Sequence, residues 1–147
     1  MGYYMDSEWC DDLHYTPEER ERLTEDFQAL ACGPEVEQPA IEYADYDAFE
    51  FLDAEDFNVT EVGDGSIIVH GFKETMKATG FIDEICSVLS KHLGEDKGRR
   101  VWIMSGEDGE KWPIVFEHGQ GARSPEMTTV YKVHISDTEM EVRGDDA

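Results

Sequence analysis

The chain has 147 residues, of which 35 are Asp or Glu and 12 are Lys or Arg, so its formal net charge is −23. Such a polyanion repels nucleic acid and anionic lipid, which argues against direct binding to DNA, RNA or a membrane surface. Its hydrophobic content of 39%, with three Trp, six Tyr and seven Phe, is too high for a disordered acidic chain and predicts a folded core.

The negative charge is concentrated in the first half of the chain. Residues 1–72 hold 20 acidic residues and two basic ones, Arg20 and Arg22, whereas residues 73–147 hold 15 acidic and ten basic residues. Within the first half, residues 23–72 contain thirteen carboxylates and no Lys or Arg. A segment whose charged side chains are all negative predicts a cationic partner.

The cysteines and the N-terminus indicate the compartment. Cys10, Cys32 and Cys86 are odd in number, widely spaced and without a paired motif, which predicts free thiols in a reducing environment. No apolar run approaches the roughly 20 residues of a membrane-spanning helix, and no basic segment followed by an apolar stretch begins the chain. We therefore expect a soluble, cytoplasmic protein.

The first elements are an arm and a helix. Residues 1–15 mix aromatic and acidic residues without a clear period and are expected to form a strand or an ordered arm. A helix begins at Pro17, because Thr16 can cap it and Glu19 completes a capping box. Gly33, followed by proline, provides its stop. The apolar positions at helical spacing are Leu23, Phe27, Leu30 and Ala31.

Residues 35–56 interleave acidic and aromatic residues, and their periodicity fits two structures. A strand would place Ile41 with Tyr43, and Phe49 with Phe51, on alternate positions. A helix would instead group Tyr46, Phe49, Leu52 and Asp53. In both cases the segment buries rings and displays carboxylates.

The following part of the chain has the pattern of an α+β core. β-Branched residues in segments 57–62 and 66–72 flank a glycine-rich turn, which predicts a hairpin. Thr79 can cap a helix that runs from Gly80 to about Leu93 with one continuous apolar face. Further strands are predicted at residues 101–104, 114–117 and 128–135, and Pro113 places the second of these at a strand start or a sheet edge.

The predicted fold class is therefore α+β. It has an antiparallel sheet of four to five strands with one packed helix, plus an N-terminal helix and an acidic aromatic segment. The chain divides into an acidic N-terminal region (residues 1–56), an α+β core (residues 57–136) and a polar, frayed tail (residues 137–147), within one compact domain.

No catalytic or metal-binding motif is distinctive. Cys10 and His14 have the spacing of two metal ligands, whereas a zinc site needs three or four. Residues 53–58 lack the glycine and the closing glutamate of an EF-hand loop. No nucleophile signature accompanies the histidines, and a histidine in an alternating strand, such as His70 or His134, is expected to be structural. We predict a non-catalytic protein with no metal or other cofactor.

The acidic segment itself is the candidate site, because its carboxylates can imitate a row of phosphates. Carboxylates two residues apart on a strand lie roughly 6.6 Å apart, and those at helical i, i+3 or i+4 spacing lie about 5–6 Å apart. DNA places one charge per about 3.4 Å of axis on each strand. The predicted partner-binding residues are Glu35, Glu37, Glu42, Asp45, Asp47, Glu50, Asp53, Glu55, Asp56, Glu61 and Asp64, with Tyr43, Tyr46 and Phe49 as aromatic anchors.

In composition this segment resembles, as a class, the small acidic DNA-mimic inhibitors of phages and mobile elements: anti-restriction, anti-CRISPR and uracil-glycosylase inhibitor proteins. The resemblance covers mainly residues 35–64, and those proteins share neither a diagnostic motif nor one fold, so no contact residue is transferred from them. It implies an inhibitor, monomeric or dimeric, that blocks nucleic-acid access to a basic partner such as a nuclease, CRISPR effector, restriction enzyme or glycosylase.

Three other interpretations remain open from the sequence. An immunity protein that plugs a basic nuclease toxin would use the same electrostatics. In a salt-adapted or adaptor α+β domain the acids would only be solvated, although the concentration of charge in one half speaks against this. The third is a small α+β enzyme that carries an acidic interaction segment.

Overall fold

The computed structural model describes residues 4–34, 36–73, 76–77, 80–107, 109, 111–124, 130–135 and 138–143. The helices are α1 (Pro17–Cys32), α2 (Ala48–Ala54) and α3 (Gly80–Lys91), with the short 3-10 helices η1 (Ile41–Tyr43) and η2 (Glu95–Lys97). The strands are β1 (Tyr4–Cys10), β2 (Leu13–Tyr15), β3 (Phe57–Glu61), β4 (Ile67–Phe72), β5 (Met76–Lys77), β6 (Arg100–Gly106), β7 (Lys111–Phe116), β8 (Val130–Ile135) and β9 (Thr138–Arg143).

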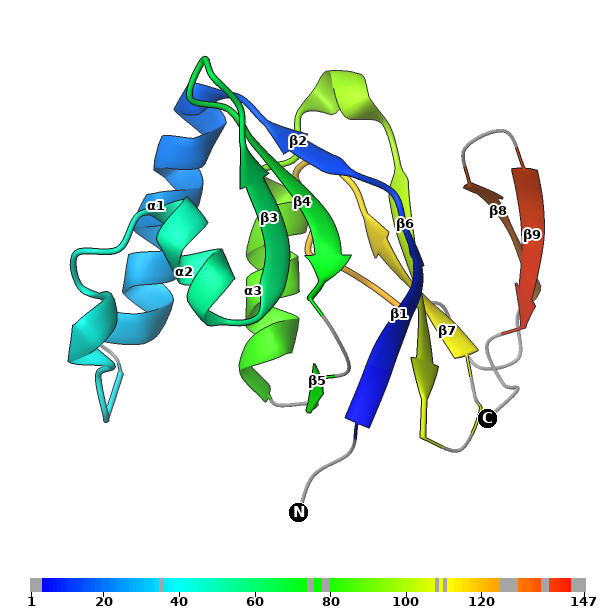
Figure 1. The fold of residues 1–147 in the computed structure, drawn as a ribbon, viewed down its shortest axis with the longest axis horizontal. Helices are drawn as coiled ribbons and strands as arrows, with labels where there is room; N and C mark the ends of the chain where they lie inside the picture. Colours follow the sequence, from blue (N-terminus) through cyan, green and yellow to red (C-terminus); the bar gives the residue numbers. More distant parts are fainter. Residues whose placement is uncertain are drawn as a thin grey trace.

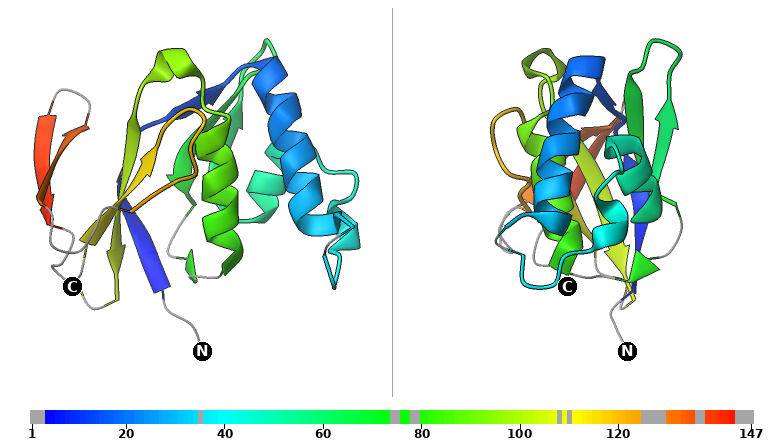
Figure 2. Two further views of the ribbon diagram at one scale, coloured as in Figure 1. Left: turned by 180° about the vertical axis from the view of Figure 1, so that it is seen from behind. Right: turned by 90° about the vertical axis from the view of Figure 1, so that its left-hand side faces the viewer.

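The described strands form three antiparallel sheets, with the orders β5-β1-β6-β7, β2-β4-β3 and β8-β9. Helix α2 packs against α1 and β3, and the β8–β9 hairpin lies at the end of the molecule away from these two helices (Figure 1). Helices α1 and α3 lie side by side on one side of the strands (Figure 2). The α+β class predicted from the sequence is confirmed.

The predicted single sheet of four to five strands is wrong. The hairpin β3–β4 pairs with β2, in a sheet separate from that of β6 and β7. Strand β1 takes the position beside β6, in a register that runs from Met5↔Gly106 to Cys10↔Trp102. The largest sheet reaches four strands only through the two-residue β5. Because β1 and β6 are far apart in the sequence, their pairing leaves no local signal, and the hydrophobic pattern did not reveal it.

The prediction that residues 137–147 are a frayed tail is wrong for residues 138–143. Residues 138–143 form β9, which pairs with β8 along the whole of its length, from Val130↔Arg143 to Ile135↔Thr138. Alternating residues of this segment, with Met140 and Val142 two apart, are compatible with a strand. Residues 144–147 of the predicted tail lie outside the described part.

The elements with local capping or turn signals are confirmed. In α1, Thr16 Oγ1 accepts a hydrogen bond from Glu19 N (3.2 Å), and Glu19 Oε1 accepts one from Thr16 N (2.9 Å), so the capping box is complete. The hairpin β3–β4 forms, and β7 contains Pro113 at the edge of its sheet. Helix α3 ends two residues before the predicted Leu93, and its predicted cap, Thr79, lies outside the described residues.

Of the two structures that residues 35–56 could adopt, the helix forms at 48–54 and no strand forms at the positions described. Asp47 caps α2, because its carboxylate accepts from Glu50 N (3.0 Å) while the Glu50 carboxylate accepts from Asp47 N (3.3 Å). This second capping box decides for the helix. Ala48, Phe51 and Leu52 form its buried side.

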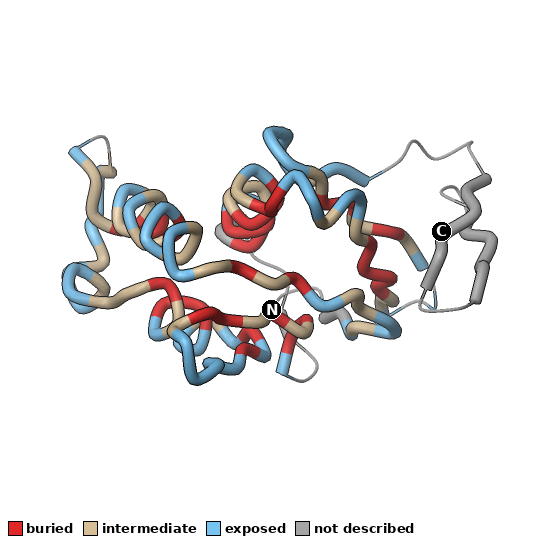
Figure 3. The backbone as a smooth tube through the Cα atoms, turned by 90° about the horizontal axis from the view of Figure 1, so that it is seen from above, coloured by how far each residue is buried: buried red, intermediate tan, exposed pale blue. Residues whose placement is uncertain are grey.

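One hydrophobic core joins both sides of the predicted boundary at residue 56. Its buried members extend from Leu13 in β2 to Phe116 in β7. Figure 3 shows these buried positions running through the strands and the facing sides of the helices. Trp102 is fully buried; its ring lies 4.7 Å from that of Phe116, and its Nε1 donates to Asp11 O (3.0 Å). Among the described helices, none is long and apolar enough to cross a membrane.

Gly71 in β4 cannot be replaced without strain. Its φ of +127° is a conformation that side chains rarely adopt, and an added Cβ would lie 2.7 Å from Cys10 Sγ. We expect Gly71→Ala to lower the free energy of unfolding by about 2 kcal/mol. The matched control is Gly63→Ala, where nothing lies within 4 Å of the added Cβ. Urea denaturation should show a change within about 0.5 kcal/mol for the control; equal losses in both variants would contradict this account.

Candidate protein-binding surface

Residues 40–48, which carry the predicted contact residues from Glu42 to Asp47, are fixed to α1 at both ends. Ala40 N donates to Ala31 O in the last turn of α1 (2.8 Å). Eight residues later, Ala48 N donates to the Oγ1 of Thr24 (2.8 Å). Because its backbone is hydrogen-bonded to a helix at each end, this segment presents its side chains in a defined arrangement.

The three predicted aromatic anchors face the core. Tyr43, Tyr46 and Phe49 are half-buried and pack against the hydrophobic cluster. The Tyr43 ring meets Phe51 edge-on at 5.1 Å, and Phe51 in turn stacks on Phe27 of α1 at 4.7 Å. These rings therefore help to hold the acidic segment in place, and their role as partner anchors stays a prediction.

The structure places the predicted carboxylates at different degrees of exposure. Glu35 lies outside the described residues. Asp47 and Glu55 are half-buried. The exposed ones are Glu37, Glu42, Asp45, Glu50, Asp53, Asp56, Glu61 and Asp64.

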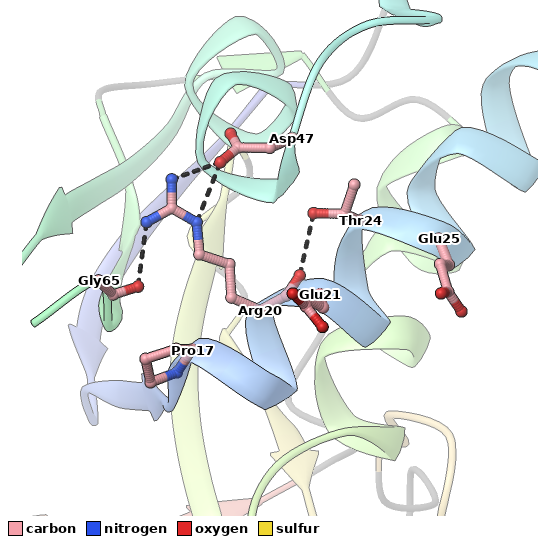
Figure 4. A pocket seen from close by; sticks show the side chains of 7 residues that line it. All are labelled: Pro17, Arg20, Glu21, Thr24, Glu25, Asp47 and Gly65. Atoms are coloured by element: carbon pink, nitrogen blue, oxygen red, sulfur yellow. Dashed lines mark hydrogen bonds and ion pairs between the residues drawn. The ribbon is translucent and has the colours of Figure 1, made fainter.

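Two of the predicted carboxylates, Asp47 and Glu61, belong to an internal ion-pair network around Arg20. The Arg20 guanidinium donates to the carboxylates of Asp47 and Glu61 and to Gly65 O (3.1 Å), and only 17% of its side chain is exposed. Figure 4 shows Arg20 reaching from α1 between Asp47 and Gly65. The network joins α1, the start of α2 and the β3–β4 hairpin, so its carboxylates serve the fold.

The same network occupies a hollow of about 470 Å³ on the surface beside α1. Its cation is already bonded to carboxylates of the chain, and the other charged side chains of its lining, Glu21 and Glu25, are acidic (Figure 4). The hollow therefore offers no free cation for an anionic ligand.

Further predicted contact residues also have internal partners. Asp53 forms an ion pair with Lys73 at 2.8 Å. Asp64 Oδ1 accepts from Ser66 N at 2.9 Å in the β3–β4 turn, and this hydrogen bond lowers the pKa of Asp64. Glu50 caps α2, as described above. These side chains shape turns and helix ends.

The remaining carboxylates take part in none of the ion pairs found among the described residues. They are Glu37, Glu42, Asp45, Glu55 and Asp56. We call Glu42, Asp45, Glu55 and Asp56, the members of this set on η1 and around α2, the acidic surface.

The charges of Glu42, Glu55 and Asp56 affect the pKa values of neighbouring groups. Burial and then the charge of Asp56 raise the pKa of Glu55. Burial, followed by the charges of Glu55 and Glu42, raises the pKa of Tyr43. Negative charge from η1 and from the end of α2 thus converges around one half-buried ring.

Two of the three cysteines have raised thiol pKa values, and the described residues hold no metal-binding cluster. All three cysteines are free thiols, as predicted. Burial raises the pKa of Cys10 to about 12 and the pKa of Cys86 well above its ordinary value, so neither is a thiolate near neutral pH. No group of three or more His, Cys, Asp or Glu among the described residues is arranged to hold a metal ion.

Comparison with known proteins found no matching family model, no matching curated protein and no matching solved structure.

Sequence reasoning missed two features near the surface. Ile41 in η1 is 76% exposed, although an alternating pattern had paired it with Tyr43. His70, interpreted as structural, bonds to both Thr60 and Asp12. A glycine directly after His70, inside a strand pattern, was the available signal, because such a glycine often marks a β-bulge.

Proposed function

We propose that this protein is a non-catalytic inhibitor that covers the nucleic-acid-binding groove of a basic protein with its acidic surface. The observation that carries the proposal is a set of carboxylates that take part in none of the ion pairs found among the described residues. Glu42 and Asp45 lie between the two hydrogen bonds to α1, and Glu55 and Asp56 follow the end of α2. A preorganised array of charges loses little conformational entropy when it binds.

The partner is a cationic protein, such as a nuclease, a CRISPR effector, a restriction enzyme or a glycosylase. A chain of net charge −23 is attracted to a basic groove and repelled by the nucleic acid that the groove normally binds. Association is expected to be fast at low salt and to weaken as salt rises, because the Debye length falls from about 10 Å at 0.1 M to about 3 Å at 1 M.

The structure defines which carboxylates a test must change. Neutralising Asp47 or Glu50 would damage the cap of α2, and neutralising Asp53 would break its ion pair with Lys73. The sharper variant therefore replaces only the acidic surface: Glu42→Gln, Asp45→Asn, Glu55→Gln and Asp56→Asn. Asparagine suits position 56, where φ is +65°, because it tolerates this conformation.

The experiment captures basic proteins from a lysate of the source cells on the tagged chain and then measures nucleic-acid binding by the captured protein. The unchanged chain should abolish that binding. The four-residue variant should bind the partner roughly thirtyfold more weakly, since exposed charge pairs contribute about 0.2–1 kcal/mol each.

A matched control removes the same number of charges elsewhere: Asp83→Asn, Glu84→Gln, Glu95→Gln and Glu107→Gln, all exposed. This control should retain most of the affinity. Equal weakening of both variants would show that net charge alone drives binding, and a captured protein that still binds nucleic acid would contradict inhibition.

A further inference from the structure

A threonine, a histidine and an aspartate form a chain of hydrogen bonds away from the acidic surface. Thr60 Oγ1 lies 2.9 Å from His70 Nε2, and His70 Nδ1 lies 2.8 Å from Asp12 Oδ1. Thr60 belongs to β3, His70 to β4 and Asp12 to the link between β1 and β2. Thr60 is exposed, and 29% of the His70 side chain and 62% of the Asp12 side chain are accessible.

For a neutral imidazole, the chemistry of the three groups determines the direction of the hydrogen bonds. An ionised carboxylate only accepts, so the proton between His70 and Asp12 belongs to Nδ1. In the neutral ring Nε2 then has a free lone pair and accepts from the Thr60 hydroxyl. This is the order of nucleophile, base and orienting carboxylate that activates a hydroxyl for attack.

A β-bulge brings His70 to Thr60. Asn58 pairs with Gly71 and Val59 pairs with Val69, so His70 is an extra residue of β4. A bulge re-aims the side chain of its extra residue. The register continues with Thr60↔Ile68, which leaves the imidazole beside the threonine of the neighbouring strand.

We propose that Thr60 is a nucleophile that accepts an acyl group from activated esters, with His70 as its general base and Asp12 as a positioning residue. Thr60 Oγ1 forms a bond to the carbonyl carbon while its proton passes to His70 Nε2. The bond from that carbon to the leaving oxygen then breaks, and His70 returns the proton to the leaving group. The products are acyl-Thr60 and an alcohol, and no oxidant or further reactant is required. This inference does not depend on the proposed inhibitor function.

The surroundings favour a neutral carbonyl over a phosphoryl donor. A phosphoryl group is anionic, and the net charge of −23 repels it, whereas an ester carries no charge. Asn58 is two residues from Thr60 on β3 and is exposed on the same side of the strand.

The test treats the full chain with p-nitrophenyl acetate, follows nitrophenolate release and maps the acetylated residue by peptide mass spectrometry. We expect acetyl-Thr60, and we expect its formation to slow about a hundredfold in His70→Gln. Thr60→Val should remove the modification and keep the fold, since valine suits an exposed strand position. His14→Gln, on the neighbouring strand β2, is the matched histidine control and should leave the rate unchanged.

Two results would overturn the proposal. Acetylation confined to lysines would exclude Thr60 as the nucleophile, and a rate that persists in Thr60→Val but falls in His70→Gln would show reaction at the imidazole alone. Asp12→Asn should slow acetylation and also change the imidazole nitrogen chemical shifts of His70, because the tautomer is no longer fixed. Unchanged shifts together with an unchanged rate would remove Asp12 from the relay.

Discussion

Replacing Phe51 by alanine should lower the free energy of unfolding by about 4 kcal/mol, as is typical for a fully buried phenylalanine. Phe51 has no exposed surface, stacks on Phe27 of α1 and meets Tyr43 of η1 edge-on. Its removal leaves a cavity between α1, η1 and α2, so the variant loses both burial and ring contacts. Urea denaturation followed by circular dichroism measures the difference.

The matched control for this prediction is Phe49→Ala on the same helix. Phe49 is only half-buried, so its replacement by alanine should lower the free energy of unfolding by about 1–2 kcal/mol. If both variants lowered the free energy of unfolding equally, the packing of Phe51 would not be what anchors α2 to α1. Under the proposed function, the Phe51 variant should also show weaker partner binding, because the acidic surface is displaced when α2 detaches.

Arg20→Met should cost about 2–3 kcal/mol, although methionine keeps much of the apolar stem. The guanidinium bonds to Asp47, Glu61 and Gly65 O at once, and its loss leaves carboxylates facing each other without a cation. Hydrogen bonds to charged groups contribute about 1.5–3 kcal/mol, and the partial exposure of Asp47 and Glu61 keeps the total below that of a buried pair. Thermal unfolding should show a midpoint lower by roughly 5–10 °C.

Arg22→Met provides the control, because Arg22 is the other basic residue of the first 72 and is exposed on the same helix. Its replacement should change stability by less than about 0.5 kcal/mol. Adding Glu61→Gln to Arg20→Met should recover part of the loss, since it removes one of the unpaired charges. A double variant less stable than Arg20→Met would show that repulsion between the carboxylates is not the cause.

The elements that the sequence predicted correctly are those whose signals lie within a few residues. The capping box of Thr16 and Glu19, the turn between β3 and β4 and the apolar face of α3 each act locally. The assembly of the strands could not be predicted in this way, because the partner of β1 begins at Arg100. Hydrophobic alternation shows that a segment is a strand and leaves its partner undetermined.

The sequence predicted the candidate site as a region. The roles of its individual residues depend on contacts that form only in the folded structure. A carboxylate in the sequence looks the same whether it meets solvent, as Asp45 does, or an arginine 27 positions away, as Asp47 does. The aromatic residues were expected to contact a partner, but their rings fill the space under η1 and α2. The relay of Thr60, His70 and Asp12 depends on a bulge, which Gly71 indicated only indirectly.

The pairing of β1 with β6 also determines when the protein can fold during synthesis. Met5 pairs with Met76 on one side and with Gly106 on the other, so the edge of β1 that pairs with β6 stays open until about a hundred further residues have left the ribosome. For most of that interval the emerged chain is strongly acidic, because its first 72 residues hold 20 acidic residues against two basic ones. We therefore expect repulsion between neighbouring nascent chains to keep their open strand edges apart, so that the acidity of the N-terminal half limits aggregation during synthesis.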